Sequence, residues 1–395
     1  MLKNNSVYDK YIFCLIFSLA FGQIGGYLQF ARVLTICLFP VLLSTITKVP
    51  NSIKKNPCSF VMLCVVWGGI SLLWSNSISE GLKMFVYYLV HFSLFIEVIV
   101  FSYFSLRPLK IISLSWISAL VLTLSIAIWE IQTGHHLYTS TLEEGHIQNY
   151  GGVINLQVFA ASTFGNYNEF ELFICYCTPF LLYLIFITDK LLIRIAYFLI
   201  LGVSFYVVVV NASRAASITM LIYFVLSVRY ILKKGGKSVL SYIVLIIALA
   251  GVLYVYSDSI FTNIFLRLES GGLESSRSEI YDKCLSIFLN TYLMGIGIGS
   301  LESSGMAAFH NMFIEVALTF GIFVFIVFLR SLWVMYKRTL HIFNIEIKTM
   351  LLCALIALPV YSIINAIYLP FPNFYVYFAS LYVFLNYSLY NYEYA

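Results

Sequence analysis

The hydrophobic pattern of the chain is a series of long apolar runs separated by short polar segments. Each run has about 17 to 25 residues, the length that a helix needs to cross a hydrocarbon core of about 30 Å. Because the runs are continuous and not short and alternating, they exclude a closed barrel. The pattern predicts an all-α integral membrane protein, a single polytopic domain over residues 1–395. We expect about twelve transmembrane helices, at residues 11–28, 30–47, 59–75, 81–103, 111–130, 168–188, 192–210, 213–228, 238–256, 310–334, 349–368 and 374–391.

Composition supports a membrane protein and argues against a metal or disulfide framework. Hydrophobic residues make up 61% of the chain and charged residues 10%, whereas about a quarter of the residues of a soluble domain are charged. The first apolar run, from Tyr11, has no small-residue cleavage signal after it, so we expect it to be retained. The eight cysteines lie almost entirely within apolar runs and form no CxxC pair, which is typical of small buried side chains.

The distribution of basic residues predicts the orientation of the chain, because lysine and arginine accumulate in cytoplasmic loops. With a cytoplasmic N-terminus, seventeen of the 23 basic residues lie on the cytoplasmic side, and both termini are cytoplasmic. Two long loops then lie outside, a first external loop at residues 131–167 and a major one at residues 257–309 that carries short amphipathic helices. Loops longer than about 15 residues are uncommon unless they are functional or disordered. Two of them on one face suggest an external working site.

Six basic residues depart from this pattern and therefore need another explanation. For Arg32 and Lys283 we favour a cation that snorkels or is solvated by its loop. Arg214 lies where one span ends and the next begins, among small residues and with no acidic residue near it in sequence. An arginine at the border of the bilayer usually pairs with a carboxylate or binds an anionic ligand, and for Arg214 we favour the ligand. The six are Arg32, Lys83, Arg214, Arg267, Arg277 and Lys283.

The most polar interval of the chain runs from Arg267 to Gly321. Within it, Ser276 and Glu279 form a capping-box pattern that predicts the start of a helix. Arg277 would lie in its first turn, where free N–H groups and an arginine both favour a phosphate. The alternative is an ion pair with a neighbouring glutamate. The helix would turn an apolar face to the membrane surface, formed by Ile280, Cys284, Leu285, Ile287 and Phe288.

His310 and Asn311 mark the point at which this interval re-enters the membrane. A histidine there can simply cap a helix or bond to a neighbour. Because its unperturbed pKa is near 6.5, a neutral imidazole can also serve as a general base. Asn311 and Glu315 are four residues apart and share a helix face, so they could orient a bound hydroxyl or pair with an arginine.

Three other features give weaker predictions. The sequence GIGIGS at residues 295–300 lacks the strand and helix context of a nucleotide-binding loop and predicts a flexible, close-packed turn. The spacing of His135, His136 and His146 is not diagnostic of a metal site. Glu97 falls within a predicted span, where we expect it to be paired inside the bundle.

Four motifs in one order resemble the O-antigen polymerase and O-antigen ligase superfamily: NASRAA from Asn211, RSEIYDK from Arg277, GIGIG from Gly295, and HNMFIEVALTFGI from His310. The resemblance implies a metal-independent glycan transferase of the bacterial inner membrane, without a cofactor and with a periplasmic site. Its donor would be an oligosaccharide on undecaprenyl diphosphate. The resemblance also implies a chain-length regulator and a flippase of the same pathway as partners. It implies no nucleic acid partner.

The resemblance also assigns roles to residues. Arg214 and Arg277, with Arg267 and Lys83, would hold the diphosphate, and His310 would deprotonate the acceptor hydroxyl. Asn311 and Glu315 would help to bind the substrate.

Polymerase and ligase differ in the acceptor, which is another lipid-linked repeat unit for the polymerase and lipid A core for the ligase. The ligase pattern begins with a histidine and a polar residue. Nine positions and then a glycine follow, and the third residue after that glycine is Gly, Thr or Tyr. Here His310, Asn311 and Gly321 fit, but Val324 takes the last place, which favours a polymerase. A lipid-linked oligosaccharide transporter is a third possibility, although transporters place polar groups near the midplane and contain repeats, whereas these candidates cluster at one face.

Overall fold

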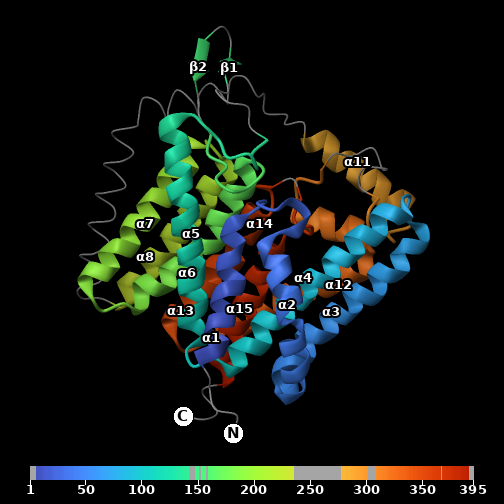
Figure 1. The fold of residues 1–395 in the computed structure, drawn as a ribbon, viewed down its shortest axis with the longest axis horizontal. Coiled ribbons are helices and arrows are strands. Elements are labelled where there is room, and N and C mark those ends of the chain that lie inside the picture. Colours follow the sequence, from blue (N-terminus) through green and yellow to red (C-terminus); the bar gives the residue numbers. More distant parts are fainter. Residues whose placement is uncertain are drawn as a thin grey trace.

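The protein is a helical bundle with a small hairpin at one end (Figure 1). The structure is a computed structural model that describes residues 6–141, 147–150, 153–156, 159–234, 277–300, 308–365 and 367–390. Both termini lie at the end of the bundle opposite the hairpin and α11 (Arg277–Asn290). The other α-helices are α1 (Ser6–Phe17), α2 (Phe30–Thr45), α3 (Asn51–Ser71), α4 (Ile78–Phe104), α5 (Pro108–Thr133), α6 (Tyr167–Ile187), α7 (Leu191–Val210), α8 (Arg214–Lys234), α12 (Met312–Leu340), α13 (Ile345–Ile356), α14 (Leu358–Tyr361) and α15 (Pro372–Tyr390).

Seven helices of the described chain are long and apolar enough to cross a membrane, which confirms a helical membrane protein. They are Phe30–Lys48, Asn51–Trp74, Ile78–Phe104, Pro108–Thr133, Tyr167–Ile187, Leu191–Val210 and Met312–Leu340.

The predicted number of about twelve is not confirmed. The predicted span 11–28 is interrupted, because α1 ends at Phe17 and glycines with positive φ follow at positions 22, 25 and 26. The predicted span 349–368 is divided between α13 and the short α14. The predicted span 238–256 lies outside the described residues.

A two-stranded hairpin, which was not predicted, is added to the helical fold. Strands β1 (Ile147–Tyr150) and β2 (Val153–Leu156) pair antiparallel, with Tyr150 opposite Val153. The hairpin lies in the connection from α5 to α6, which is the segment predicted as the first external loop. The side of the membrane on which this loop lies remains a prediction.

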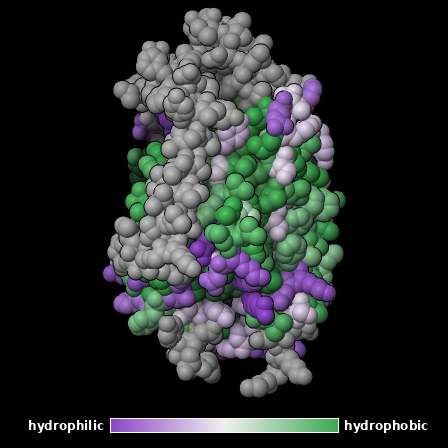
Figure 2. All heavy atoms as spheres, turned by 90° about the vertical axis from the view of Figure 1, so that its left-hand side faces the viewer, coloured by the Kyte–Doolittle hydropathy of each residue, from purple (hydrophilic) through white to green (hydrophobic). Residues whose placement is uncertain are grey.

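The core of the bundle is built around α6, whose span is more fully buried than any other described span. Helix α5 packs against α1 and α6, and α4 packs against α2 and α15. The α5–α6 contact includes the indole of Trp116 stacked on the ring of Phe180, with centroids 5.5 Å apart. On the face near α7 and α8, Figure 2 shows a hydrophobic belt with hydrophilic residues gathered below it. This banding is what a membrane-spanning bundle requires.

Helix α12 is broken at Gly321, where φ is 75° and ψ is 178°. The turn that follows α11 enters this break. The N–H of Ile322 donates to the carbonyl of Leu293 at 2.9 Å, and the N–H of Ile296 donates to the carbonyl of Leu318 at 2.7 Å. The break therefore joins the major polar interval to the start of α12.

Glycine is required on both sides of this junction. A Cβ at Gly295 would lie 2.4 Å from the carbonyl oxygen of Leu318, and one at Gly321 would lie 2.5 Å from that of Met294. Such distances are too short for any side chain, and φ is positive at both positions. The GIGIGS segment is thus the close-packed turn that the sequence predicted.

Candidate functional site

Arg214 is the first residue of α8 and is exposed. The turn before it is fixed by Asn211, which is buried. The side-chain oxygen of Asn211 accepts the N–H of Ala160 at 2.8 Å, and its amide donates to the Ala160 carbonyl at 3.0 Å. The motif NASRAA therefore anchors the α7–α8 corner to the chain that follows the hairpin, and this leaves the arginine at the helix start.

His310 lies in the turn immediately before α12 and is half-buried. Its φ of 51° is in the left-handed region, which is uncommon for a residue with a side chain and is found most often at functional sites or tight turns. The hydroxyl of Tyr281 on α11 donates to the carbonyl of His310 at 3.1 Å. This bond ties α11 to the start of α12.

Arg277 begins α11, as the capping-box pattern predicted, and lies one turn before Tyr281. Its side chain is outside the described part of the structure, and so is the whole of Arg267. The tie between Tyr281 and His310 nevertheless brings the backbone start of α11 to the same region as the start of α12. The role of both arginines remains a prediction.

Helix α11 also packs on the broken part of α12 through a small apolar cluster. Cys284 is buried there with Ile296, Phe309 and Leu318, and burial raises the pKa of its thiol. Leu285, which was expected on the same apolar face, is 58% exposed. The predicted membrane-facing surface is therefore divided, with Cys284 facing the protein.

Asn311 is the N-cap of α12. Its side-chain oxygen accepts the N–H of Phe313 at 2.8 Å and the N–H of Ile314 at 3.3 Å. These bonds satisfy two of the donors that a helix start leaves free. Asn311 thus fixes where α12 begins, and its contact with a substrate remains a prediction.

Glu315 is buried one turn further along α12, at 1% exposure. Its two carboxyl oxygens accept the backbone N–H groups of Tyr368 at 2.6 Å and Leu369 at 3.0 Å. The carboxyl group therefore holds the segment that leads into α15. A contact of Glu315 with the substrate remains a prediction. In the structure, the residue bridges α12 and the segment that leads into α15.

Lys83 lies in the second turn of α4, and its ammonium group is 3.3 Å from the carboxylate of Glu80. Both side chains are more than a third exposed. A pair of this kind is worth little in stability, so the lysine can leave its glutamate for a stronger anion. Its predicted diphosphate contact remains a prediction.

The expectation for Arg32 was wrong. The residue is buried, at 8% exposure, and its side chain does not snorkel. It donates to the ring Nε2 of His91 at 3.1 Å and to the carbonyl of Pro370 at 2.9 Å, and it lies 4.3 Å above the ring of Tyr87. The segment 368–370 is thus held by Arg32 from α2 and by Glu315 from α12. Sequence reasoning missed His91, because a single histidine in an apolar run carries no pattern.

The weaker candidates also have defined positions. The Nδ1 of His136 is 3.1 Å from the carboxylate of Glu130, which also accepts the N–H of Ser162 at 2.6 Å. No group of three or more metal-ligating side chains occurs among the described residues, and His146 lies outside them. Glu97 is fully buried, but within the described chain neither of its oxygens has a hydrogen-bond partner. The predicted pairing of Glu97 is therefore wrong for this part of the structure.

Comparison with known proteins bears on the segment that holds the candidate residues. Residues 196–329 match the family model described as O-antigen ligase. This segment includes Arg214, Arg277 and His310. Over 315 residues, the chain is 26% identical to the teichuronic acid biosynthesis protein TuaE of Bacillus subtilis strain 168. The aligned part is 72% of this chain and 61% of that protein, so the chain spans about three fifths of the length of this relative. Together these matches confirm the resemblance of the chain to the O-antigen polymerase and O-antigen ligase superfamily.

Proposed function

We propose that the chain polymerises lipid-linked oligosaccharide repeat units of a surface polysaccharide such as an O-antigen. It would transfer the growing glycan from undecaprenyl diphosphate to a sugar hydroxyl of another repeat unit, on the periplasmic face of the inner membrane. One observation carries the proposal: Arg214, Arg277 and His310 lie at the starts of α8, α11 and α12, within the segment that matches the family model.

The starts of α8 and α11 suit an anionic leaving group. The first turn of a helix has free N–H groups and a positive dipole end, and both attract phosphate. An arginine at the same position adds a charge and can donate two parallel hydrogen bonds to one phosphate. In the proposed reaction Arg214 and Arg277 bind the diphosphate of the donor, and they stabilise the charge that develops on it as the glycan leaves.

His310 would act on the acceptor. The hydroxyl oxygen of the acceptor sugar attacks the anomeric carbon of the donor while its proton passes to the neutral imidazole. The bond from the anomeric carbon to the diphosphate oxygen breaks, and its electron pair leaves with that oxygen. Direct displacement of this kind inverts the anomeric configuration. The strained turn at His310 and its tie to Tyr281 would hold the imidazole in a fixed position.

A ligase that transfers finished polymer to lipid A core is the second candidate, because the matched family model is described as O-antigen ligase. Val324 at the last place of the ligase pattern favours the polymerase. The two are distinguished by expressing the chain in a host that lacks its own polymerase. A ladder of long chains supports the polymerase, core capped with preformed polymer supports the ligase, and accumulation of flipped, unpolymerised units supports a transporter.

The diphosphate site is tested by Arg277→Ala in the same host. We expect chain extension to be lost while protein level and membrane insertion are unchanged. Lys283→Ala is the matched control, because Lys283 is an exposed cation on the same helix. Full chain extension by the Arg277→Ala variant would contradict the proposed role of this arginine.

A further inference from the structure

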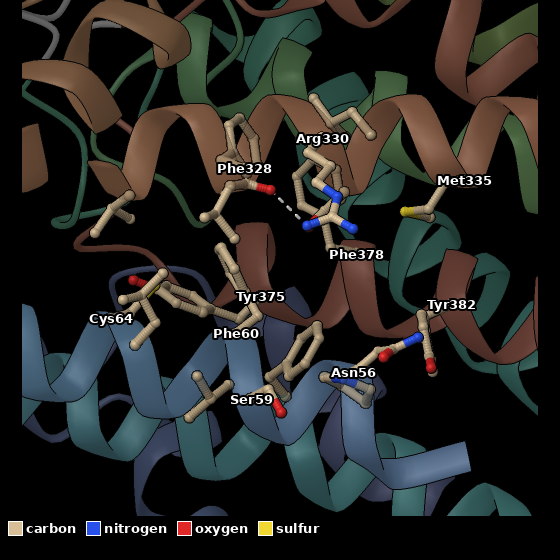
Figure 3. A pocket seen from close by; sticks show the side chains of 18 of the residues that line it. Asn56, Ser59, Phe60, Cys64, Phe328, Arg330, Met335, Tyr375, Phe378 and Tyr382 are labelled. Atoms are coloured by element: carbon tan, nitrogen blue, oxygen red, sulfur yellow. Dashed lines mark hydrogen bonds between the residues drawn. The ribbon is translucent and has the colours of Figure 1, made fainter. Parts of the chain in front are cut away.

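A second site lies in a groove between α3 and α12. The cavity has a volume of about 480 Å³, and α4 and α15 form its inner wall. We call it the α3–α12 groove. Figure 3 shows Phe60 and Cys64 of α3, Phe328 of α12, and Tyr375 and Phe378 of α15 around it. Its volume falls within the range of about 300–1,000 Å³ that is common for ligand sites.

The groove is apolar along most of its length and polar at one end. Asn56 and Ser59 line it near the start of α3, and Arg330 and Arg338 line it in the second half of α12. The hydroxyl of Tyr382 in α15, which also lines it, donates to the carbonyl of Ile53 at 3.0 Å. The polar end is therefore at the end of the bundle that carries the chain termini (Figure 1).

The two arginines are placed to receive an anion. Arg330 is exposed and Arg338 is half-buried. No carboxylate lies within ion-pair distance of either of them among the described residues. Lys337, the neighbouring cation, instead lies 4.8 Å above the ring of Trp333 and does not line the groove. A tryptophan and a lysine together are typical of the membrane–water interface, which favours a position at headgroup depth for this part of α12.

We propose that the α3–α12 groove binds an anionic glycerophospholipid from the leaflet on the side of the termini. The headgroup phosphate would contact Arg330 and Arg338, and an acyl chain would lie between Phe60, Val324 and Phe378. Basic pockets between membrane helices on the cytoplasmic side bind lipids of this kind, and arginine is suited to phosphate. The undecaprenyl donor fits less well, because in the proposed function its diphosphate lies beside His310, before the start of α12, whereas Arg330 and Arg338 lie in the second half of that helix.

The test uses the purified full-length chain in detergent and native mass spectrometry after incubation with phosphatidylglycerol or phosphatidylcholine. We expect the wild-type chain to retain phosphatidylglycerol preferentially. Each of the substitutions Arg330→Gln and Arg338→Gln should weaken its retention about fivefold. Lys337→Gln, on the same helix but outside the groove, should leave retention unchanged. Ser331→Trp, which adds bulk to the groove wall, should lower retention of both lipids.

Three results would overturn the proposal. One is equal retention of both lipids by the wild-type chain. Another is a loss in Lys337→Gln as large as that in the two arginine variants, which would indicate general surface attraction. The third is displacement of phosphatidylglycerol by undecaprenyl phosphate, which would assign the groove to the tail of the donor. Because no glycan donor is present, none of these results depends on the polymerase reaction.

Discussion

Replacing Glu315 tests how the start of α15 is held in place. Both carboxyl oxygens accept backbone N–H groups, from Tyr368 at 2.6 Å and from Leu369 at 3.0 Å, in a buried position. The substitution Glu315→Ala leaves two buried donors without an acceptor, at a cost of about 1–3 kcal/mol each. The free energy of unfolding should therefore fall by about 2–6 kcal/mol. Glu315→Gln keeps one amide oxygen as an acceptor and should lose about half as much.

The assay is thermal unfolding of the purified chain in detergent, followed by intrinsic tryptophan fluorescence. Asp282→Ala is the matched control, because Asp282 is an exposed carboxylate on α11. We expect the highest transition temperature for the control, a lower one for Glu315→Gln and the lowest for Glu315→Ala. If Glu315→Ala unfolds at the same temperature as the control, the carboxyl group does not hold this segment and the reasoning is refuted.

Three further substitutions test local parts of the account. Gly321→Ala should destabilise the fold by more than about 2 kcal/mol, since the backbone conformation there is accessible essentially to glycine alone. The new Cβ would also lie 2.5 Å from the carbonyl oxygen of Met294. A wild-type transition temperature for this variant would contradict the expectation. Asn311→Ala removes the N-cap of α12 and should cost about 1 kcal/mol, and an unchanged unfolding midpoint would show that the cap is dispensable. Arg32→Gln should lower the transition temperature by more than Lys283→Gln, because only Arg32 is buried against His91; equal transition temperatures would mean that the buried bonds contribute nothing.

The sequence predicted the parts of the fold that depend on local pattern. The apolar runs gave most of the membrane helices, and the capping-box residues Ser276 and Glu279 gave the start of α11 at Arg277. The glycines of the GIGIGS segment gave a close-packed turn. These features follow from residue type and spacing alone, which explains why they could be predicted.

The features that the sequence missed depend on contacts between distant segments. The buried bond from Arg32 to His91 joins residues 59 positions apart. The contacts of Glu315 join residues more than fifty positions apart. The break of α12 at Gly321 exists because the turn after α11 inserts there. Because each partner is unremarkable in its own stretch of sequence, only the packed bundle shows what it does.

The same distinction applies to the candidate site. Its helix starts were predicted because an arginine or a histidine at the border of an apolar run is unusual and therefore visible. The sequence could not show that Asn311 and Glu315 form bonds within the protein, since a polar residue in the first turn of a helix can serve either the fold or a ligand. The structure places both in bonds that shape the start of α12 and the segment beside it.

The central claim is that His310 takes the proton of the acceptor hydroxyl in glycan transfer. The most direct measurement is the rate of chain extension by the purified chain in proteoliposomes supplied with lipid-linked repeat units. The comparison is between His310→Ala and His341→Ala, since His341 is an exposed histidine that follows the other end of α12. Loss of a general base typically slows a reaction by about 10²–10⁴-fold, and the account predicts a loss of this size for His310→Ala and a wild-type rate for His341→Ala. Extension by His310→Ala at the wild-type rate and protein level would contradict it.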